Sequence, residues 1–95
     1  MIIEQIKLEN GTAQGLKWEF ENASLLLIKA DMGYVMCGYL NMETADKLGD
    51  VAAVVSGVDS FEDVLQTSLK SVSKKALDIG IEEGMTGRQA LEKMF

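Results

Sequence analysis

The pattern of apolar residues changes near residue 40, and this change constrains the fold more than any other feature of the sequence. Before it, four successive segments have the alternating or continuous apolar character of β-strands. After it, short helical patterns alternate with strand-like segments at 51–55 and 68–72. A chain of 95 residues buries one modest core, so we predict a single domain over residues 1–95. The predicted fold class is α+β: a mixed sheet of about six strands, with an N-terminal antiparallel meander and short helices mainly on one face.

The first two predicted strands form a hairpin in which apolar and polar residues alternate. The apolar positions are Ile2, Ile6 and Leu8 in one strand and Leu16, Trp18 and Phe20 in the other. Asn10-Gly11 predicts a two-residue type I′ turn, because both residues tolerate positive φ. That turn would put the two apolar sets on opposite faces, since side chains alternate along a strand. We therefore expect a β-bulge near Gln14-Gly15 that restores one common apolar face.

Two further strands, at 23–30 and 34–40, are almost continuously apolar, which predicts that both of their faces are covered. Four short helices are expected after residue 40, and each is preceded by a residue that can cap it: Asn41, Ser60, Ser73 and Thr86. The predicted inward-facing residues are Met42, Ala45 and Leu48; Phe61, Val64 and Leu65; Ala76, Leu77 and Ile79; and Ala90, Leu91 and Met94. Thr86 and Gln89 fit a capping box. The connections at 41–50 and 58–67 are about as long as a parallel crossover requires.

The residue types that the chain lacks exclude several kinds of site. Without histidine there is no Ser-His-Asp triad, no Cys-His pair and no imidazole-ligated zinc within one chain. A single cysteine allows no intramolecular disulfide and no cysteine metal cluster, and we predict no metal site and no cofactor. The net charge of −6, without any basic run, argues against nucleic acid as a partner. We expect a cytoplasmic protein without a membrane partner, because the sequence starts with no secretory pattern and has no apolar run near the ~18 residues of a membrane span.

Cys37 is the first candidate for chemistry. It stands in the apolar strand at 34–40, next to Gly38, and its simplest interpretation is a small buried hydrophobe that reacts slowly. The alternative is a nucleophile, or a thiol that contacts a ligand. Because the chain has no histidine, activation of this thiol would need Lys29, Arg88 or a helix N-terminus nearby.

The segment from Gly84 to Arg88 is the second candidate. Its simplest interpretation is a turn and a helix cap with a surface arginine. The functional interpretation is a small anion pocket, in which Thr86 caps the helix and the backbone N–H groups that follow bind a carboxylate or phosphate. Arg88, the only arginine, would grip that anion in bidentate fashion, and Gly84 and Gly87 would let it approach the backbone.

Three blocks of sequence, at 33–40 (GYVMCGYL), 47–50 (KLGD) and 84–91 (GMTGRQAL), resemble the YunC-like family, a small bacterial and archaeal domain of unknown function. The resemblance covers nearly the whole chain, and the spacing between the blocks fits. It implies a compact α+β domain and supplies no activity.

Three functions stay open at this point. The first is a non-catalytic ligand-binding or interaction module that works as a homo-oligomer, because several nearly apolar strands leave a sheet face that helices on one side cannot cover. The second is a small thiol-dependent enzyme that uses Cys37, with Arg88 binding an anionic substrate. The third is a structural subunit of a larger assembly. Native mass spectrometry would separate them best, because it reports subunit number and a retained ligand together.

Overall fold

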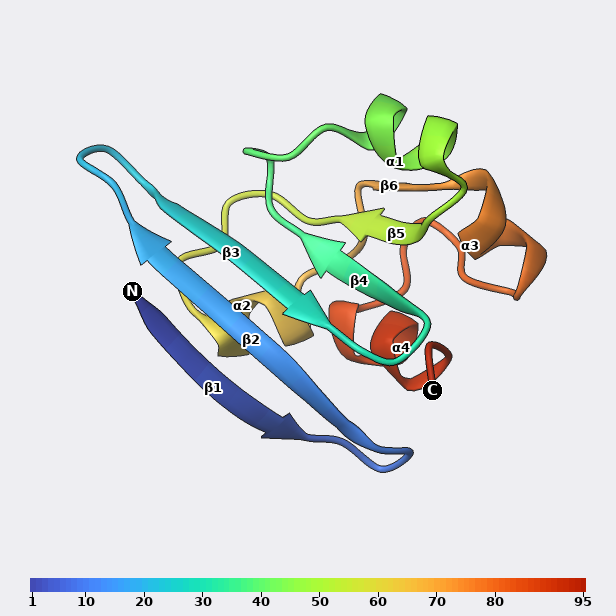
Figure 1. The fold of residues 1–95 in the computed structure, drawn as a ribbon, viewed down its shortest axis with the longest axis horizontal. Helices are drawn as coiled ribbons and strands as arrows, with labels where there is room; N and C mark the ends of the chain where they lie inside the picture. Colours follow the sequence, from blue (N-terminus) through green and yellow to red (C-terminus); the bar gives the residue numbers. More distant parts are fainter.

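A six-stranded sheet runs through the molecule, and its strands lie in the order in which they occur along the chain (Figure 1). The structure is a computed structural model that describes residues 1–95. The strands are β1 (Ile2–Lys7), β2 (Thr12–Glu19), β3 (Ser24–Lys29), β4 (Gly33–Met36), β5 (Val51–Val54) and β6 (Ser71–Val72). Neighbouring strands are antiparallel except for β4 and β5, which are parallel. The sheet is therefore mixed, and the predicted α+β fold class is confirmed.

The four helices are α1 (Met42–Leu48), α2 (Phe61–Gln66), α3 (Lys74–Asp78) and α4 (Gly87–Glu92). All four predicted caps form: the side chains of Asn41, Ser60, Ser73 and Thr86 each accept a hydrogen bond from a backbone N–H of the helix that follows. Thr86 and Gln89 bond reciprocally, so the predicted capping box is confirmed. None of these helices has the length and apolar character needed to cross a lipid bilayer.

The two faces of the sheet are covered unequally. On one face, which we call the helix face, α2, α3 and α4 pack against the strands around a core of 16 buried residues. On the other, which we call the open face, α1 alone packs, around a cluster of 4 buried residues that come from β4, β5 and α1 itself. In Figure 1, α2 and α4 lie behind the sheet, and nothing lies in front of β1, β2 and β3. The helices are thus mainly on one face, as predicted.

The β1–β2 hairpin differs from the prediction in its turn. The Leu8 N–H donates to the Gly11 carbonyl at 2.8 Å, so the loop consists of Glu9 and Asn10, and neither Asn10 nor Gly11 has a positive φ. A distant residue holds this loop: the carboxylate of Glu92 accepts hydrogen bonds from the backbone N–H groups of Glu9 and Asn10, both at 2.9 Å. The predicted type I′ turn at Asn10-Gly11 is therefore wrong, because a tertiary contact sets the turn.

The predicted β-bulge near Gln14-Gly15 is also wrong, because pairing between β1 and β2 is uninterrupted along both strands. Gly15 serves a different purpose: a Cβ built there would come within 2.6 Å of the Phe61 ring of α2. A Cβ at Gly11 would meet the ring of Phe95 at the same distance, 2.6 Å. Both glycines thus leave room for an aromatic ring, and neither is needed for a change of strand register.

Without the bulge, the apolar residues of the hairpin are divided between the two faces. Ile6 and Ala13 oppose each other and belong to the helix face, where Ala13 is fully buried. Ile3 and Leu16 oppose each other on the open face, and Trp18 follows on the same side because side chains alternate. Ile3 is 63% exposed and Trp18 is 50% exposed. The open face of β1–β3 therefore carries a row of apolar side chains that is accessible to water at Ile3 and Trp18.

Three residues predicted to face inward are exposed instead. Leu48 at the end of α1, and Leu77 and Ile79 at α3, are between 40% and 72% exposed. Both helices are short, and each buries a single residue, Ala45 in α1 and Ala76 in α3. The other predicted inward residues are buried or pack against a core cluster. A helix of one or two turns presents too narrow a stripe to bury every apolar residue of its pattern.

Two predicted strands are shorter than expected, and one connection differs. β4 ends at Met36, so residues 37–40 lie outside the sheet, and β6 starts only at Ser71.

The connection at 41–50 is a parallel crossover, because β4 and β5 are parallel. The connection at 58–67 is not, since β6 is antiparallel to β5. A connection of this length permits either strand direction, so length alone does not decide it.

Candidate functional site

A row of apolar side chains crosses the open face at right angles to the strands. It passes in register through five strands, at Ile3, Leu16, Leu27, Met36 and Val54. The exposed fraction falls from 63% at Ile3 to 1% at Met36, because α1 covers only β4 and β5. One half of the row is therefore buried beneath α1, and the other half is bare.

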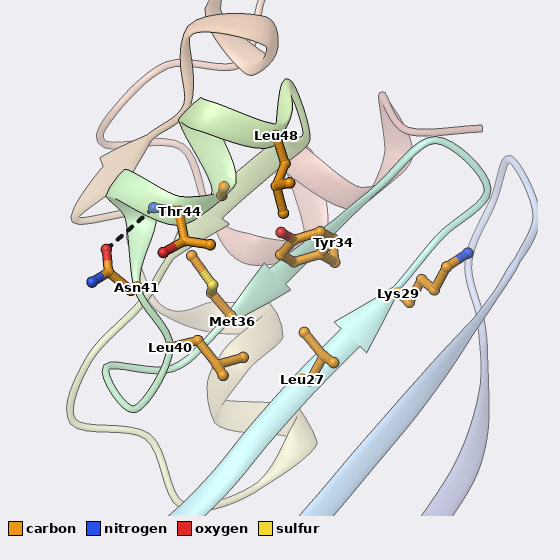
Figure 2. Close-up of a pocket in the computed structure, with 9 residues that line it drawn as sticks. Leu27, Lys29, Tyr34, Met36, Leu40, Asn41, Thr44 and Leu48 are labelled. Atoms are coloured by element: carbon orange, nitrogen blue, oxygen red, sulfur yellow. Dashed lines mark hydrogen bonds between the residues drawn. The ribbon is translucent and has the colours of Figure 1, made fainter.

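A cleft of about 370 Å³ lies where these two halves meet, between α1 and the strands β3 and β4 (Figure 2). We call it the α1 cleft. Its apolar lining comes from Leu27, Tyr34, Met36, Leu40, Ala45 and Leu48, and its polar lining from Lys29, Asn41 and Thr44. In Figure 2, Met36, Leu40, Leu27 and Tyr34 surround one space, which Leu48 overhangs from α1. A concave, mainly apolar site with a few polar groups is the usual form of a small-ligand site.

The polar groups of the α1 cleft stand at its two ends. At one end, the Oδ1 atom of Asn41 accepts a hydrogen bond from the Glu43 N–H at 2.7 Å, and its Nδ2 donors are free, as is the hydroxyl of Thr44. At the other end, the Nζ atom of Lys29 donates to the Ala30 carbonyl at 3.1 Å and keeps further donors available. No carboxylate lines the cleft. The cleft therefore has an apolar centre with uncharged donors at one end, and at the rim of the other end Lys29, whose ammonium points away from that centre in Figure 2.

Tyr34 forms one wall of the α1 cleft and is fixed by a hydrogen bond. Its hydroxyl donates to Oδ2 of Asp50 at 2.7 Å. Burial, together with this hydrogen bond and the negative charge of Asp50, raises the pKa of Tyr34 from 10.0 to about 12. The phenol is therefore protonated at neutral pH, where it acts as a donor and not as a general base.

The raised pKa of Tyr34 predicts a titration step that two variants identify. We expect spectrophotometric titration to show a tyrosinate step near pH 12 that is absent from Tyr34→Phe. Asp50→Asn should move this step to lower pH, because the amide carries no negative charge. Since the folded pKa lies above 10.0, the contribution of this group to stability is complete below pH 10 and is lost as the pH rises toward 12. If the tyrosinate step of the Asp50→Asn variant stays near pH 12, the charge and hydrogen bond of Asp50 do not raise the pKa of Tyr34.

Cys37 lies outside the α1 cleft. It is 4% exposed, and its Sγ accepts a hydrogen bond from the Leu26 N–H at 3.3 Å and lies 4.0 Å from the Ser24 carbonyl oxygen. The predicted burial is confirmed, and the slow reaction of the thiol stays a prediction. Neither Lys29 nor Arg88 lines the shallow hollow beside it. Neither of the two cations considered for activating Cys37 therefore lies in this hollow, and the thiol-enzyme hypothesis stays a prediction.

The glycines and the cap of the predicted anion pocket have structural roles at the start of α4. Gly84 turns the chain with a φ of 91°, and Thr86 caps the helix. Gly87 is buried, and its N–H donates to the Thr67 carbonyl at 3.1 Å. The N–H of Gln89 is bound by the Thr86 hydroxyl at 3.2 Å. Two of the first three amide groups of α4 are thus already occupied.

Arg88 lines a polar hollow of about 480 Å³ next to this helix. The same hollow is lined by Glu9 and Glu92, and the carboxylate of Glu92 holds the β1–β2 loop. A carboxylate in the hollow opposes an anionic ligand, so the anion pocket stays a prediction that gains no new support here. No three cysteine, aspartate or glutamate side chains converge on a point that could hold a metal ion.

The α1 cleft was not predicted from the sequence. Its lining comes from β3, β4, the loop after β4 and α1, and most of these residues are ordinary core types. One signal was present in the sequence: Lys29 is a charged residue in an otherwise almost continuously apolar segment. A single lysine at a strand end is too common for this signal to identify a site.

The comparisons with known proteins agree with the fold. A model of the family described as "Domain of unknown function (DUF1805)" matches residues 36–94. The uncharacterized protein YunC of Bacillus subtilis (strain 168) is 33% identical over 94 residues, which is 95% of this chain and 93% of that protein. The crystal structure of a protein of unknown function, TA1206 from Thermoplasma acidophilum, matches with a TM-score of 0.94 and 39% identity over 99% of this chain and 92% of that chain. The predicted resemblance is confirmed: the chain belongs to the DUF1805 family of domains of unknown function.

Proposed function

We propose that the protein is a non-catalytic interaction module that works as a homo-oligomer, with a second copy covering the open face. The observation that carries this proposal is the outer half of the apolar row, where Ile3 is exposed and Leu16 and Leu27 are half-buried. α1 covers the other half of the row and its cluster reaches Leu27 of β3, whereas no element of the same chain covers β1 and β2 on this face. The largest contiguous apolar patch on a protein surface is often a site of interaction.

An aromatic cluster extends the patch at the end of β2. The ring centroids of Trp18 and Phe20 are 5.7 Å apart, and those of Phe20 and Tyr39 are 5.4 Å apart. All three side chains are between 43% and 50% exposed. Grouped surface aromatics are typical of the centre of an interface, because each ring buries a large area with little loss of side-chain freedom.

The charge of the open face favours a copy of the same chain as the partner. Strands β1–β3 place no carboxylate on this face, although the chain has 15 acidic residues and a net charge of −6. The charged groups there are Lys7 and Lys29, both toward one end of the strands. Two acidic chains repel each other over most of their surfaces but not here. If the copies pack sheet on sheet with antiparallel strands, the lysine ends lie apart.

The size of the patch predicts a reversible contact. β1, β2 and β3 are 6, 8 and 6 residues long, and strands about 4.8 Å apart at about 3.3 Å per residue give this part of the sheet a footprint of about 320 Å². The aromatic cluster and the edge of α1 enlarge it, but it stays below the about 800 Å² per partner of a standard interface. We therefore expect an equilibrium between monomer and oligomer that shifts with concentration.

Sedimentation velocity over a series from micromolar to millimolar concentration tests the proposal. The wild type is expected to associate as concentration rises, and Ile3→Glu to remain a monomer, because the contact would bury unpaired carboxylates. Leu77→Glu is the matched control: it introduces the same charge at a similarly exposed residue, 54% against 63%, on α3 away from the open face. It should associate like the wild type.

Two results would overturn the proposal. One is a wild type that sediments as a monomer at every concentration, and the other is an equal loss of association in Leu77→Glu. Circular dichroism establishes that Ile3→Glu is folded, and Trp18→Ala provides a second variant of the same face without an added charge. Purification with a different protein at a fixed ratio would instead favour a structural subunit of a larger assembly.

A further inference from the structure

We infer that the α1 cleft binds a small amphiphilic monocarboxylate, with its apolar tail between α1 and the strands β3 and β4 and its carboxylate at Lys29. This inference goes beyond the proposed self-association and does not depend on it. The α1 cleft and the bare half of the open face share Leu27 and Lys29, but their other residues differ.

The apolar part of the cleft suits a flexible tail. Its volume of about 370 Å³ lies at the lower end of the range for small-ligand sites, about 300–1,000 Å³. Met36 and Leu40 line it, and the unbranched thioether side chain of a methionine adapts to an irregular apolar neighbour. Each further methylene that enters such a space strengthens binding about fourfold, until the space is full.

The charges of the cleft select the head group. Lys29 is the one charged residue of the lining, and its ammonium is bonded to a backbone carbonyl, which leaves its positive charge unneutralised. On its outer side Lys29 borders a shallow hollow with Asp31 and Asp50, but neither carboxylate lines the cleft itself. An anionic head at the rim would therefore meet a cation and free N–H donors.

The opposite end of the cleft limits the tail. There the free donors of Asn41 and Thr44 carry no charge, so they do not compete with Lys29 for a carboxylate. A methyl end that reached them would displace water from two polar groups without replacing its hydrogen bonds. The preferred tail is therefore of medium length, ending against Met36 and Leu40.

Octanoate and octanol are the probes, because they share a tail and differ in charge. Titration followed by methyl NMR of Met36 and Leu40, below the micelle concentration of octanoate, is expected to show octanoate binding at least about tenfold more tightly than octanol, the effect of one charge-assisted hydrogen bond. Lys29→Met keeps the apolar stem and should abolish this preference while octanol binds as before. Lys47→Met, a lysine of α1 outside the lining, is the matched control and should keep the preference.

A second pair of variants tests the position of the tail. Thr44→Phe fills one end of the cleft and should weaken both probes, whereas Glu43→Phe, next to it but outside the lining, should weaken neither. Three results would each overturn the inference. They are equal affinities for octanol and octanoate, a Lys29→Met variant that still prefers octanoate, and NMR chemical-shift changes that are confined to Ile3 and Leu16. The same titrations on Ile3→Glu are expected to give the same affinities, which separates failure of this inference from failure of the proposed self-association.

Discussion

Replacing Gly87 by alanine is expected to lower the free energy of unfolding by about 3 kcal/mol, the upper end of the usual cost of overpacking. A Cβ at Gly87 would overlap the Val64 carbonyl oxygen and would lie 3.0 Å from the carbonyl carbon. Both atoms belong to the backbone of α2, so they move only if α2 separates from α4. That separation would also strain the hydrogen bond from the Gly87 N–H to the Thr67 carbonyl. Helix propensity alone would predict the opposite sign, since alanine favours a helix by about 1 kcal/mol over glycine.

Gly38→Ala is the matched control for Gly87→Ala. A Cβ at Gly38 meets nothing within 4 Å, and its φ is not positive, so a change within about 0.5 kcal/mol is expected. Urea unfolding of both variants beside the wild type measures the difference through the midpoint at constant slope. If Gly87→Ala unfolds at the same urea concentration as Gly38→Ala, the close contact between α2 and α4 is not what requires glycine here.

The features that could be predicted from the sequence are those that neighbouring residues determine. Asn41, Ser60, Ser73 and Thr86 cap the helices that follow them within three residues, and the predicted helices and their caps are confirmed. The strand-rich start and the fold class follow similarly from short-range alternation. The β1–β2 turn could not be predicted, because Glu92 from the other end of the chain holds its backbone.

The β-bulge predicted at Gly15 was wrong for the same reason, because a contact distant in sequence requires this glycine. Gly15 suggested a bulge because a bulge is the local reason for glycine in a strand. Its actual reason is the Phe61 ring, which reaches it only after α2 has packed on the sheet. The α1 cleft was missed for a related reason: its shape depends on how far α1 extends across the open face, and residue spacing carries no information about that distance.

Replacing Ser73 by alanine is expected to cost about 3 kcal/mol, because one hydroxyl serves three backbone groups. The Oγ atom of Ser73 accepts hydrogen bonds from the N–H groups of Ala52 at 3.0 Å and Ala76 at 3.2 Å, and donates to the Asp50 carbonyl at 2.7 Å. Ser73 is fully buried, so water does not replace it readily. Each buried group left without a partner costs about 1–3 kcal/mol. Ser73 therefore links α3 to β5 and to Asp50, the residue whose carboxylate accepts the Tyr34 hydroxyl.

Ser60→Ala separates this network from an ordinary helix cap. Ser60 accepts one hydrogen bond, from the Asp63 N–H at 3.1 Å in an exposed position, so its loss should cost about 1 kcal/mol. Ser73→Ala should also affect the wall of the α1 cleft, because the Asp50 carboxylate accepts the Tyr34 hydroxyl at 2.7 Å. If Asp50 loses its anchor, the pKa of Tyr34 falls from about 12 toward 10.0, whereas Ser60→Ala leaves it unchanged. A Ser73→Ala protein with the stability of Ser60→Ala and an unshifted Tyr34 titration would mean that Ser73 only caps α3.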